Sequence, residues 1–311
     1  MRPIRPIIRW ALPCIFVIVL LPSWALFLSG GMRAVAGWVA LVTAGQILVP
    51  LSALALLVYG IWKRRFSRPM QVTCVLALLA LWPGLWGFGI LTIAFPFDLE
   101  SSRPAATVRL PSDEVLRVGW GGDRLATNYH AFTPDQRWAY DLLIEPALHG
   151  SERLEDYGCY GTPVVAPVSA RVHHAQDGAP DEIPGKVSMN LKNPVGNAVM
   201  LELQTGTYLV IAHLKPNSVL VKAGDDVAEG DRIGECGNSG NTSEPHIHIH
   251  HQRQDPKDRP VNVSEGLPLY FRDHDGDPMP EGGLEKRDDG RYVMTGATVR
   301  HVGTAEPPLA E

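Results

Sequence analysis

The hydrophobic positions of the chain divide it into two unlike parts. Three apolar stretches without a charged residue fill most of the first hundred residues, at 10–29, 34–62 and 72–97. A helix needs about 20 apolar residues to cross the hydrocarbon core of a bilayer, so each stretch is long enough to span it. The sequence therefore predicts a membrane anchor of three transmembrane helices within residues 1–100.

Basic residues flank the three spans unevenly. Only Arg33 and Arg103 lie on one side, and the others precede the first span or follow the second: Arg2, Arg5, Arg9, Lys63, Arg64, Arg65 and Arg68. Because positively charged loops tend to stay in the cytoplasm, we expect a multi-pass protein of the cytoplasmic (inner) membrane whose chain after Phe97 faces the periplasm or the extracellular space. The first stretch is long for a cleaved secretory signal and has no obvious small-residue cleavage site, which favours an anchor.

From about residue 101 onward the pattern changes to short runs of β-branched and other apolar residues, separated by Gly, Pro, Asn and Asp. This pattern is typical of many strands joined by tight turns, and no long amphipathic helix interrupts it. We expect a linker at 101–107, an all-β, mainly antiparallel domain at 108–271 and a polar C-terminal extension at 272–311. Within that extension, residues 291–302 alternate enough for one more strand, and the last few residues are expected to be disordered.

Composition narrows the classes of partner. The formal net charge is -5, and the acidic residues all follow Phe97, which argues against a nucleic-acid partner. Cys14 and Cys74 lie in apolar runs, Cys159 and Cys236 lie in the polar half, and no CxxC pair occurs. A cysteine zinc site or a framework of several disulfides is therefore not expected.

The segment 245–248, Pro-His-Ile-His, carries the strongest chemical signal. A strand places residues two apart on the same face, roughly 6.6 Å apart at about 3.3 Å per residue, so His246 and His248 can share one site. An alternating strand produces such a pair by accident, and His250 and His251 extend it into a general histidine-rich tract. The pair therefore indicates a metal only if other ligands converge on it.

Two further residues are candidates to converge there. Asp141 interrupts an apolar run, and a buried carboxylate needs a partner. His213 closes the apolar run 208–212. A catalytic zinc commonly has three protein ligands and one open position for water, so these residues together would be sufficient for a zinc site.

The order of these segments resembles the lysostaphin/LytM-type zinc metallopeptidases. The resemblance covers about residues 128–252 and rests on Asp141 and four segments: 161–167 (GTPVVAP), 212–214 (AHL), 237–240 (GNSG) and 245–248 (PHIH). It implies a compact antiparallel β domain that cleaves peptide bonds of peptidoglycan with Zn2+. By motif, Asp141 and His248 would be metal ligands, and His213 and His246 would be the catalytic pair that polarises water and stabilises the tetrahedral intermediate.

One position departs from that pattern. The family's first ligand is a histidine four residues before the aspartate, and Arg137 occupies this place. A guanidinium stays protonated and cannot bind zinc. His130 is the nearest upstream imidazole and would reach the metal if the segment between it and Asp141 loops out. The predicted zinc ligands are therefore His130, Asp141 and His248, which would activate a water for hydrolysis.

Three hypotheses follow for the function. The first is a membrane-anchored zinc metalloendopeptidase acting on peptidoglycan. The second, prompted by Arg137, is a catalytically degenerate LytM-like domain that binds the cell wall or regulates another hydrolase. The third, a metal store or sensor, leaves His213 and the loop 237–240 unexplained. An outward-facing domain would also place Cys159 and Cys236 in an oxidising compartment, which allows a disulfide between them. The sequence alone does not give their separation.

Overall fold

The computed structural model describes residues 6–63, 67–288, 290 and 292–303. The chain forms two compact units, Met1–Phe97 and Asp98–Glu311. The basic residues Arg2, Arg5, Arg64 and Arg65 and the last eight residues, for which disorder was expected, lie outside the described part of the chain.

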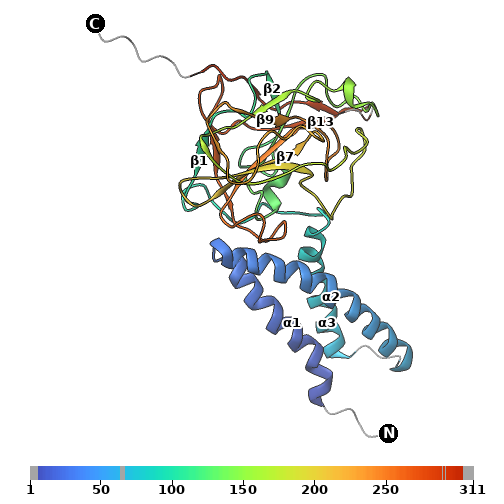
Figure 1. Ribbon diagram of the computed structural model, residues 1–311. Helices are drawn as coiled ribbons and strands as arrows, with labels where there is room; N and C mark the ends of the chain where they lie inside the picture. Colours follow the sequence, from blue (N-terminus) through green and yellow to red (C-terminus); the bar gives the residue numbers. More distant parts are fainter. Residues whose placement is uncertain (1–5, 64–66, 289, 291, 304–311) are drawn as a thin grey trace. The chain divides into compact units, whose positions relative to one another are not determined.

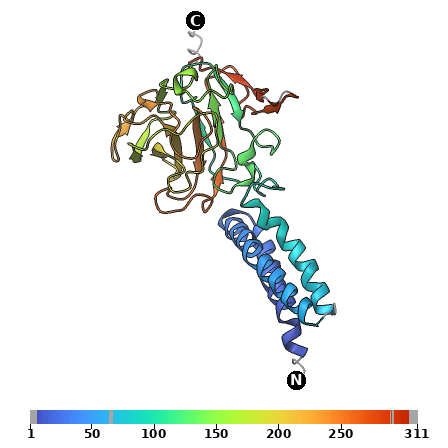
Figure 2. The same cartoon turned by 90° about the vertical axis from the view of Figure 1, so that its right-hand side faces the viewer.

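The first unit consists of three helices that lie side by side (Figures 1 and 2). They are α1 (Pro6–Phe27), α2 (Gly31–Lys63) and α3 (Arg68–Trp86), and all three are long and apolar enough to cross a membrane. Helices α2 and α3 approach closely where Gly45 faces Gly84, since a Cβ on Gly45 would lie 2.5 Å from the Gly84 Cα. Small residues at helix crossings allow such close approach in membrane-spanning bundles.

The third helix differs from its expected span of 72–97. It begins at Arg68, directly after Ser67, and ends at Trp86. Gly89 and Leu91 have positive φ angles of 68° and 51°, so the backbone turns away from the helical path although the side chains remain apolar. The prediction from hydrophobicity alone therefore put the C-terminal end of this helix at residue 97, beyond its actual end at Trp86.

The second unit is a mainly antiparallel β domain without a long helix among its described residues. Its main sheet has nine strands in the described part of the chain (Figure 1). In order across the sheet, they are β15 (Thr298–Val299), β2 (Leu116–Trp120), β3 (Tyr140–Leu143), β10 (Ile247–Gln252), β7 (Tyr208–Leu214), β6 (Asn197–Glu202), β5 (Ala170–Gln176) and β8 (Asp226–Val227), with β11 (Gly266–Leu267) paired to β10.

Three smaller strand pairs complete the domain. The pair β4 (Pro163–Val165) with β9 (Arg232–Glu235) and the pair β13 (Leu284–Lys286) with β14 (Tyr292–Met294) are antiparallel. The pair β1 (Ala106–Val108) with β12 (Leu269–Phe271) is parallel. Two short 3-10 turns also occur, η1 (Tyr129–Phe132) and η2 (Leu154–Asp156).

The central strands bury apolar side chains on one face and polar side chains on the other. Leu142, Ile247 and Ile211 belong to one large apolar core, in which all three are fully buried. Because side chains alternate between faces along a strand, Asp141 and His248 point to the opposite face, where they are directly paired across β3 and β10. The core therefore fixes the register that brings a carboxylate and an imidazole together.

The C-terminal segment is more than a polar extension. Strand β15 joins the main sheet beside β2, with Val299 opposite Leu116, and both side chains are fully buried. The segment 272–311 is therefore not only the expected polar extension, because Val299 completes the apolar core at the edge of the sheet. The strand expected within 291–302 is present as the two short strands β14 and β15.

Candidate metal centre

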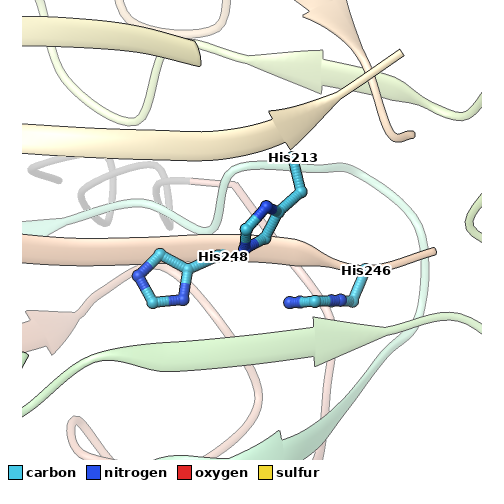
Figure 3. A group of neighbouring side chains, drawn as sticks. All are labelled: His213, His246 and His248. Carbon is cyan, nitrogen blue, oxygen red and sulfur yellow. The ribbon is translucent and has the colours of Figure 1, made fainter. Parts of the chain in front are cut away.

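Five polar side chains meet on the face of the sheet opposite the apolar core. They are between 2% and 8% exposed, so water screens their charges poorly: His130, Asp141, His213, His246 and His248. They form two groups whose ligand atoms lie within 4.8 Å of one another, and both contain His248. One group is His130, Asp141 and His248, and the other is His213, His246 and His248 (Figure 3).

Asp141 is at the middle of the cluster. Its carboxylate lies 2.8 Å from Nδ1 of His248, 3.4 Å from Nε2 of His246 and 3.5 Å from Nε2 of His130. Burial by itself would raise the pKa of Asp141, but the imidazoles of His130 and His246 hold it well below its usual range. The carboxyl group is therefore an anion surrounded by nitrogen atoms.

His130 reaches the cluster because the segment before β3 loops out. It lies in η1, where Asn128 caps the turn by accepting a hydrogen bond from the His130 backbone N–H at 3.1 Å. The same Asn128 oxygen lies 3.1 Å from Nδ1 of His130 and accepts its proton, which leaves Nε2 with a free lone pair toward Asp141. Burial lowers the pKa of His130 to about 3, so this imidazole is neutral and able to bind a metal.

Arg137 points away from the cluster. Its guanidinium donates to the backbone carbonyl and to the carboxylate of Asp123, both at 2.8 Å. Trp138 donates to the same Asp123 carboxylate at 2.8 Å. Arg137 therefore helps to close the loop that carries His130, and it is His130, seven positions earlier in the chain, that contacts Asp141.

An unusual backbone conformation aims His213. It follows Ala212, which faces His248 across β7 and β10, so regular alternation would turn His213 to the core. Its φ of 64° breaks the alternation, and its ring lies 4.9 Å from that of His246 and 5.6 Å from that of His248, centre to centre (Figure 3). Such a φ costs a non-glycine residue of the order of 1 kcal/mol, which the surrounding contacts must offset.

The loop 237–240 supplies part of those contacts. The Ser239 carbonyl accepts from Nδ1 of His213 at 2.8 Å, and the Ser239 hydroxyl donates to the Leu214 carbonyl at 2.7 Å. The loop packs directly on Gly196, where an added Cβ would lie 2.4 Å from Ser239. A disulfide between Cys159 and Cys236, with Cα atoms 5.7 Å apart, holds the start of this loop.

Carbonyl groups also set the proton positions of the catalytic candidates. Nδ1 of His246 donates to the Glu244 carbonyl at 2.7 Å, as Nδ1 of His213 does to the Ser239 carbonyl. Nε2 is then the nitrogen of each ring that serves the cluster, and that of His246 lies 3.4 Å from the Asp141 carboxylate. Burial lowers the pKa of His213 well below its usual value. For His246, burial acts in the same direction, but the attraction of Asp141 prevails and raises the pKa. One imidazole is therefore neutral and the other readily protonated.

The histidine tract divides between the two faces of β10. His250 lies on the cluster face, with Nδ1 2.9 Å from Nε2 of His248 and Nε2 3.0 Å from the amide oxygen of Gln252. His251 contacts Thr207 at 2.7 Å and the Pro268 carbonyl at 3.1 Å on the other face. The sequence interpretation treated both as background, yet two-residue alternation from His248 already distinguished them.

The group His130, Asp141 and His248 fits a zinc ion. Two imidazole nitrogens and a carboxylate oxygen are common zinc ligands, and tetrahedral coordination at 2.0–2.1 Å separates neighbouring ligand atoms by about 3.3 Å. The separations of 2.8 Å and 3.5 Å to Asp141 bracket that value. The group His213, His246 and His248 lacks a carboxylate to offset the charge of a dication.

Residues 155–263 match the family model described as Peptidase family M23. This segment is similar to M23 peptidases. The matched range includes His213, His246 and His248, whereas His130 and Asp141 precede it.

Similar proteins include a peptidoglycan DD-endopeptidase, ShyA, from Vibrio cholerae serotype O1. It is 30% identical over 145 residues, which are 46% of this chain and 30% of that protein. The chain therefore spans about a third of the relative that it matches.

Two solved structures similar to this chain are those of a prophage-encoded M23 protein and of an antimicrobial peptidase. A mutant of the catalytic domain of the prophage-encoded M23 protein EnpA from Enterococcus faecalis has 16% identity and a TM-score of 0.34, covering 52% of this chain and 93% of that one. The antimicrobial peptidase lysostaphin from Staphylococcus simulans has 19% identity and a TM-score of 0.30, covering 49% and 47%.

Proposed function

We propose that this protein is a membrane-anchored zinc metalloendopeptidase that hydrolyses peptide bonds of peptidoglycan. The observation that carries the proposal is the position of His130, which completes a ligand set with Asp141 and His248 beside two further imidazoles. The M23 match supports a peptidase, and the similarity to a peptidoglycan DD-endopeptidase supports the substrate class. The alternative, a catalytically degenerate binding domain, was prompted by Arg137 because an arginine cannot be the first zinc ligand. The proposal answers this objection with His130 as that ligand.

A zinc ion held by these three residues would lower the pKa of a water molecule toward neutrality and polarise the scissile carbonyl group. The remaining chemistry is proton transfer by two histidines. Nε2 of the neutral His213 accepts the proton that the attacking water loses, and later donates it to the nitrogen of the departing amine. Nε2 of His246, the more basic ring, donates a hydrogen bond to the oxygen on which negative charge develops.

The proposed membrane anchor supports a site of action beside a membrane. Three apolar helices precede the domain, and the uneven distribution of basic residues supports a cytoplasmic N-terminus with the β domain on the outer side. Peptidoglycan lies on that side, so the proposed orientation brings the proposed site and substrate into one compartment.

The test uses the full chain purified in detergent and loaded with zinc. It is incubated with insoluble peptidoglycan, and the release of new amino groups is measured. We expect digestion by the wild-type chain and its loss in His246→Ala and Asp141→Ala. His149→Ala serves as the matched control, because this exposed ring stacks on Tyr157 outside the cluster and its removal should leave digestion unchanged. A zinc-loaded wild type that binds the wall without releasing amines would refute the proposal and favour the binding domain.

A further inference from the structure

A cavity of about 720 Å³ lies on the same face of the sheet as the proposed metal centre. Its floor is a row of residues paired across four strands: His174, Met200, Val210 and His250. A parallel row contains Ala212, His248 and Asp141. On each shared strand the two rows are two residues apart, as Val210 is from Ala212 and His250 is from His248. Side chains two apart on a strand are about 6.6 Å apart, the length of two extended peptide residues.

His250 belongs to both the cavity and the surroundings of the centre. It lines the floor of the cavity, while its Nδ1 lies 2.9 Å from Nε2 of His248. A peptide held at the centre would therefore place a residue about two positions from its scissile bond over this floor. The cavity is large enough for an amino-acid residue with its side chain.

The rim of the cavity is basic. Lys192 comes from one loop, and Lys257 and Arg259 come from another, and all three are exposed. None of them forms an ion pair with an acidic residue in the part of the chain that the structure describes. Lining residues include a single carboxylate, that of Asp135.

This basic rim is unusual for the domain that carries it. All 33 acidic residues of the protein follow Phe97, whereas eight of its 28 basic residues precede it, so 20 basic residues face 33 acidic ones from Asp98 on, a formal net charge of −13. Three unpaired cations around one cavity attract an anion locally although the domain as a whole repels it.

The wall that carries two of these cations is fixed to the rest of the domain. Asp135 is 3% exposed, and one of its carboxylate oxygens accepts the backbone N–H of Asn262 at 2.7 Å. The backbone N–H of Gly266 donates to the Pro134 carbonyl at 2.7 Å. The second carboxylate oxygen of Asp135 has no hydrogen-bond partner among the described residues and is an acceptor for a peptide N–H. The segment with Lys257 and Arg259 is thus held on its C-terminal side.

We propose that this cavity is a subsite for a carboxylate-bearing residue of the substrate peptide, about two residues from the scissile bond. The basic rim binds the carboxylate, and the apolar side chains of Met200 and Val210 contact the aliphatic part of the residue. The inference rests on the proposed peptidase function, because the neighbouring centre makes the bound peptide a substrate. Substrates whose carboxylates are amidated would then bind more weakly.

The test measures binding rather than turnover. The full chain in detergent carries His246→Ala and zinc throughout, so that the probe is not consumed. The probe is a fluorescein-labelled tetrapeptide, L-Ala-γ-D-Glu-meso-diaminopimelyl-D-Ala, with free carboxylates, and its comparison is the same peptide with all carboxylates amidated. The variant is Lys192→Gln, Lys257→Gln and Arg259→Gln combined. The matched control removes three exposed cations that do not line the cavity: Arg153→Gln, Lys222→Gln and Lys286→Gln.

We expect the rim variant to raise the Kd of the free-carboxylate peptide at least fivefold, with less than a twofold change for the amidated peptide and for the control variant. A smaller rise, or an equal rise in the control, overturns the subsite. Wall digestion by the unmodified chain is a separate readout. Digestion without carboxylate-dependent binding refutes the subsite alone, and carboxylate-dependent binding without digestion refutes the proposed peptidase alone.

Discussion

Asn128 is the residue on which the position of His130 depends most directly. Its side-chain amide is fully buried, donates to the carbonyls of Gly122 and Ala139 at 2.9 Å and 3.2 Å, and accepts from the backbone and ring of His130. Asn128→Ala leaves two buried carbonyls and two buried N–H groups, the backbone and ring N–H of His130, without these partners. At about 1–3 kcal/mol for each such group, the free energy of unfolding should fall by about 4 kcal/mol or more.

The same substitution should weaken zinc binding. Loss of a side chain that orients a metal ligand typically lowers metal affinity by about 10–100-fold. Asn128→Asp is the matched variant, because it keeps the oxygen that accepts from Nδ1 of His130 while losing the amide donor. We expect the aspartate variant to lose stability but to keep zinc affinity within about threefold of the wild type, measured by competition with a chromophoric chelator in the full chain.

Two results would refute this reasoning. Wild-type zinc affinity in a folded Asn128→Ala chain would show that His130 needs no such orientation. An equal loss of affinity in both variants would show that the amide donor, and not the oxygen, positions the ligand. Circular dichroism at the assay temperature establishes which variants are folded.

Further predictions concern stability and catalysis. Burial raises the pKa of Asp135 from 3.8 to about 6, so between about pH 4 and 6 the folded state keeps a proton that the unfolded state has released, and stability falls as the pH rises through this window. Asp135→Asn should therefore raise the free energy of unfolding at pH 7 by about 3 kcal/mol and leave it nearly unchanged at pH 3. Urea unfolding at the two pH values measures both. Replacing Cys159 and Cys236 together by serine opens a loop with a sequence separation of 77 and should cost about 4 kcal/mol of unfolding free energy, against no change on replacing Cys14. His213→Ala should lower wall digestion at least about 100-fold while bound zinc is retained, and parallel loss of zinc would contradict its role in proton transfer.

The fold could be predicted from the sequence wherever a segment followed a single hydrophobic pattern. Long uncharged apolar stretches indicated three helices, and the alternation around Asp141 and His248 placed both side chains on one face of a sheet. The end of α3 was missed because Leu91 and its neighbours are as apolar as the helix before them, and only their backbone angles end it. A strand was expected within 291–302, but the pairing of β15 with β2 and the burial of Val299 depend on contacts between distant segments, which local alternation does not encode.

For the candidate site, the sequence predicted the residue types but not what orients them. Its residue types followed from motif order, and His130 was a candidate as the nearest upstream imidazole, but the sequence contains no sign that Asn128 would cap the turn and orient the ring. The left-handed backbone at His213 was equally hidden, since nothing in the apolar run before it marks a break in alternation. The proximity of Cys159 and Cys236 depends on how β4 meets β9, which local patterns do not encode.

The central claim is that His130, rather than the residue at position 137, completes a zinc site with Asp141 and His248. It is tested most directly by the zinc content of the full chain after dialysis, measured by mass spectrometry for the wild type, His130→Ala and His213→Ala. We predict about one zinc per chain for the wild type and for His213→Ala, and loss of zinc from His130→Ala. One tightly bound zinc in a folded His130→Ala chain, or none in the wild type, would contradict the account.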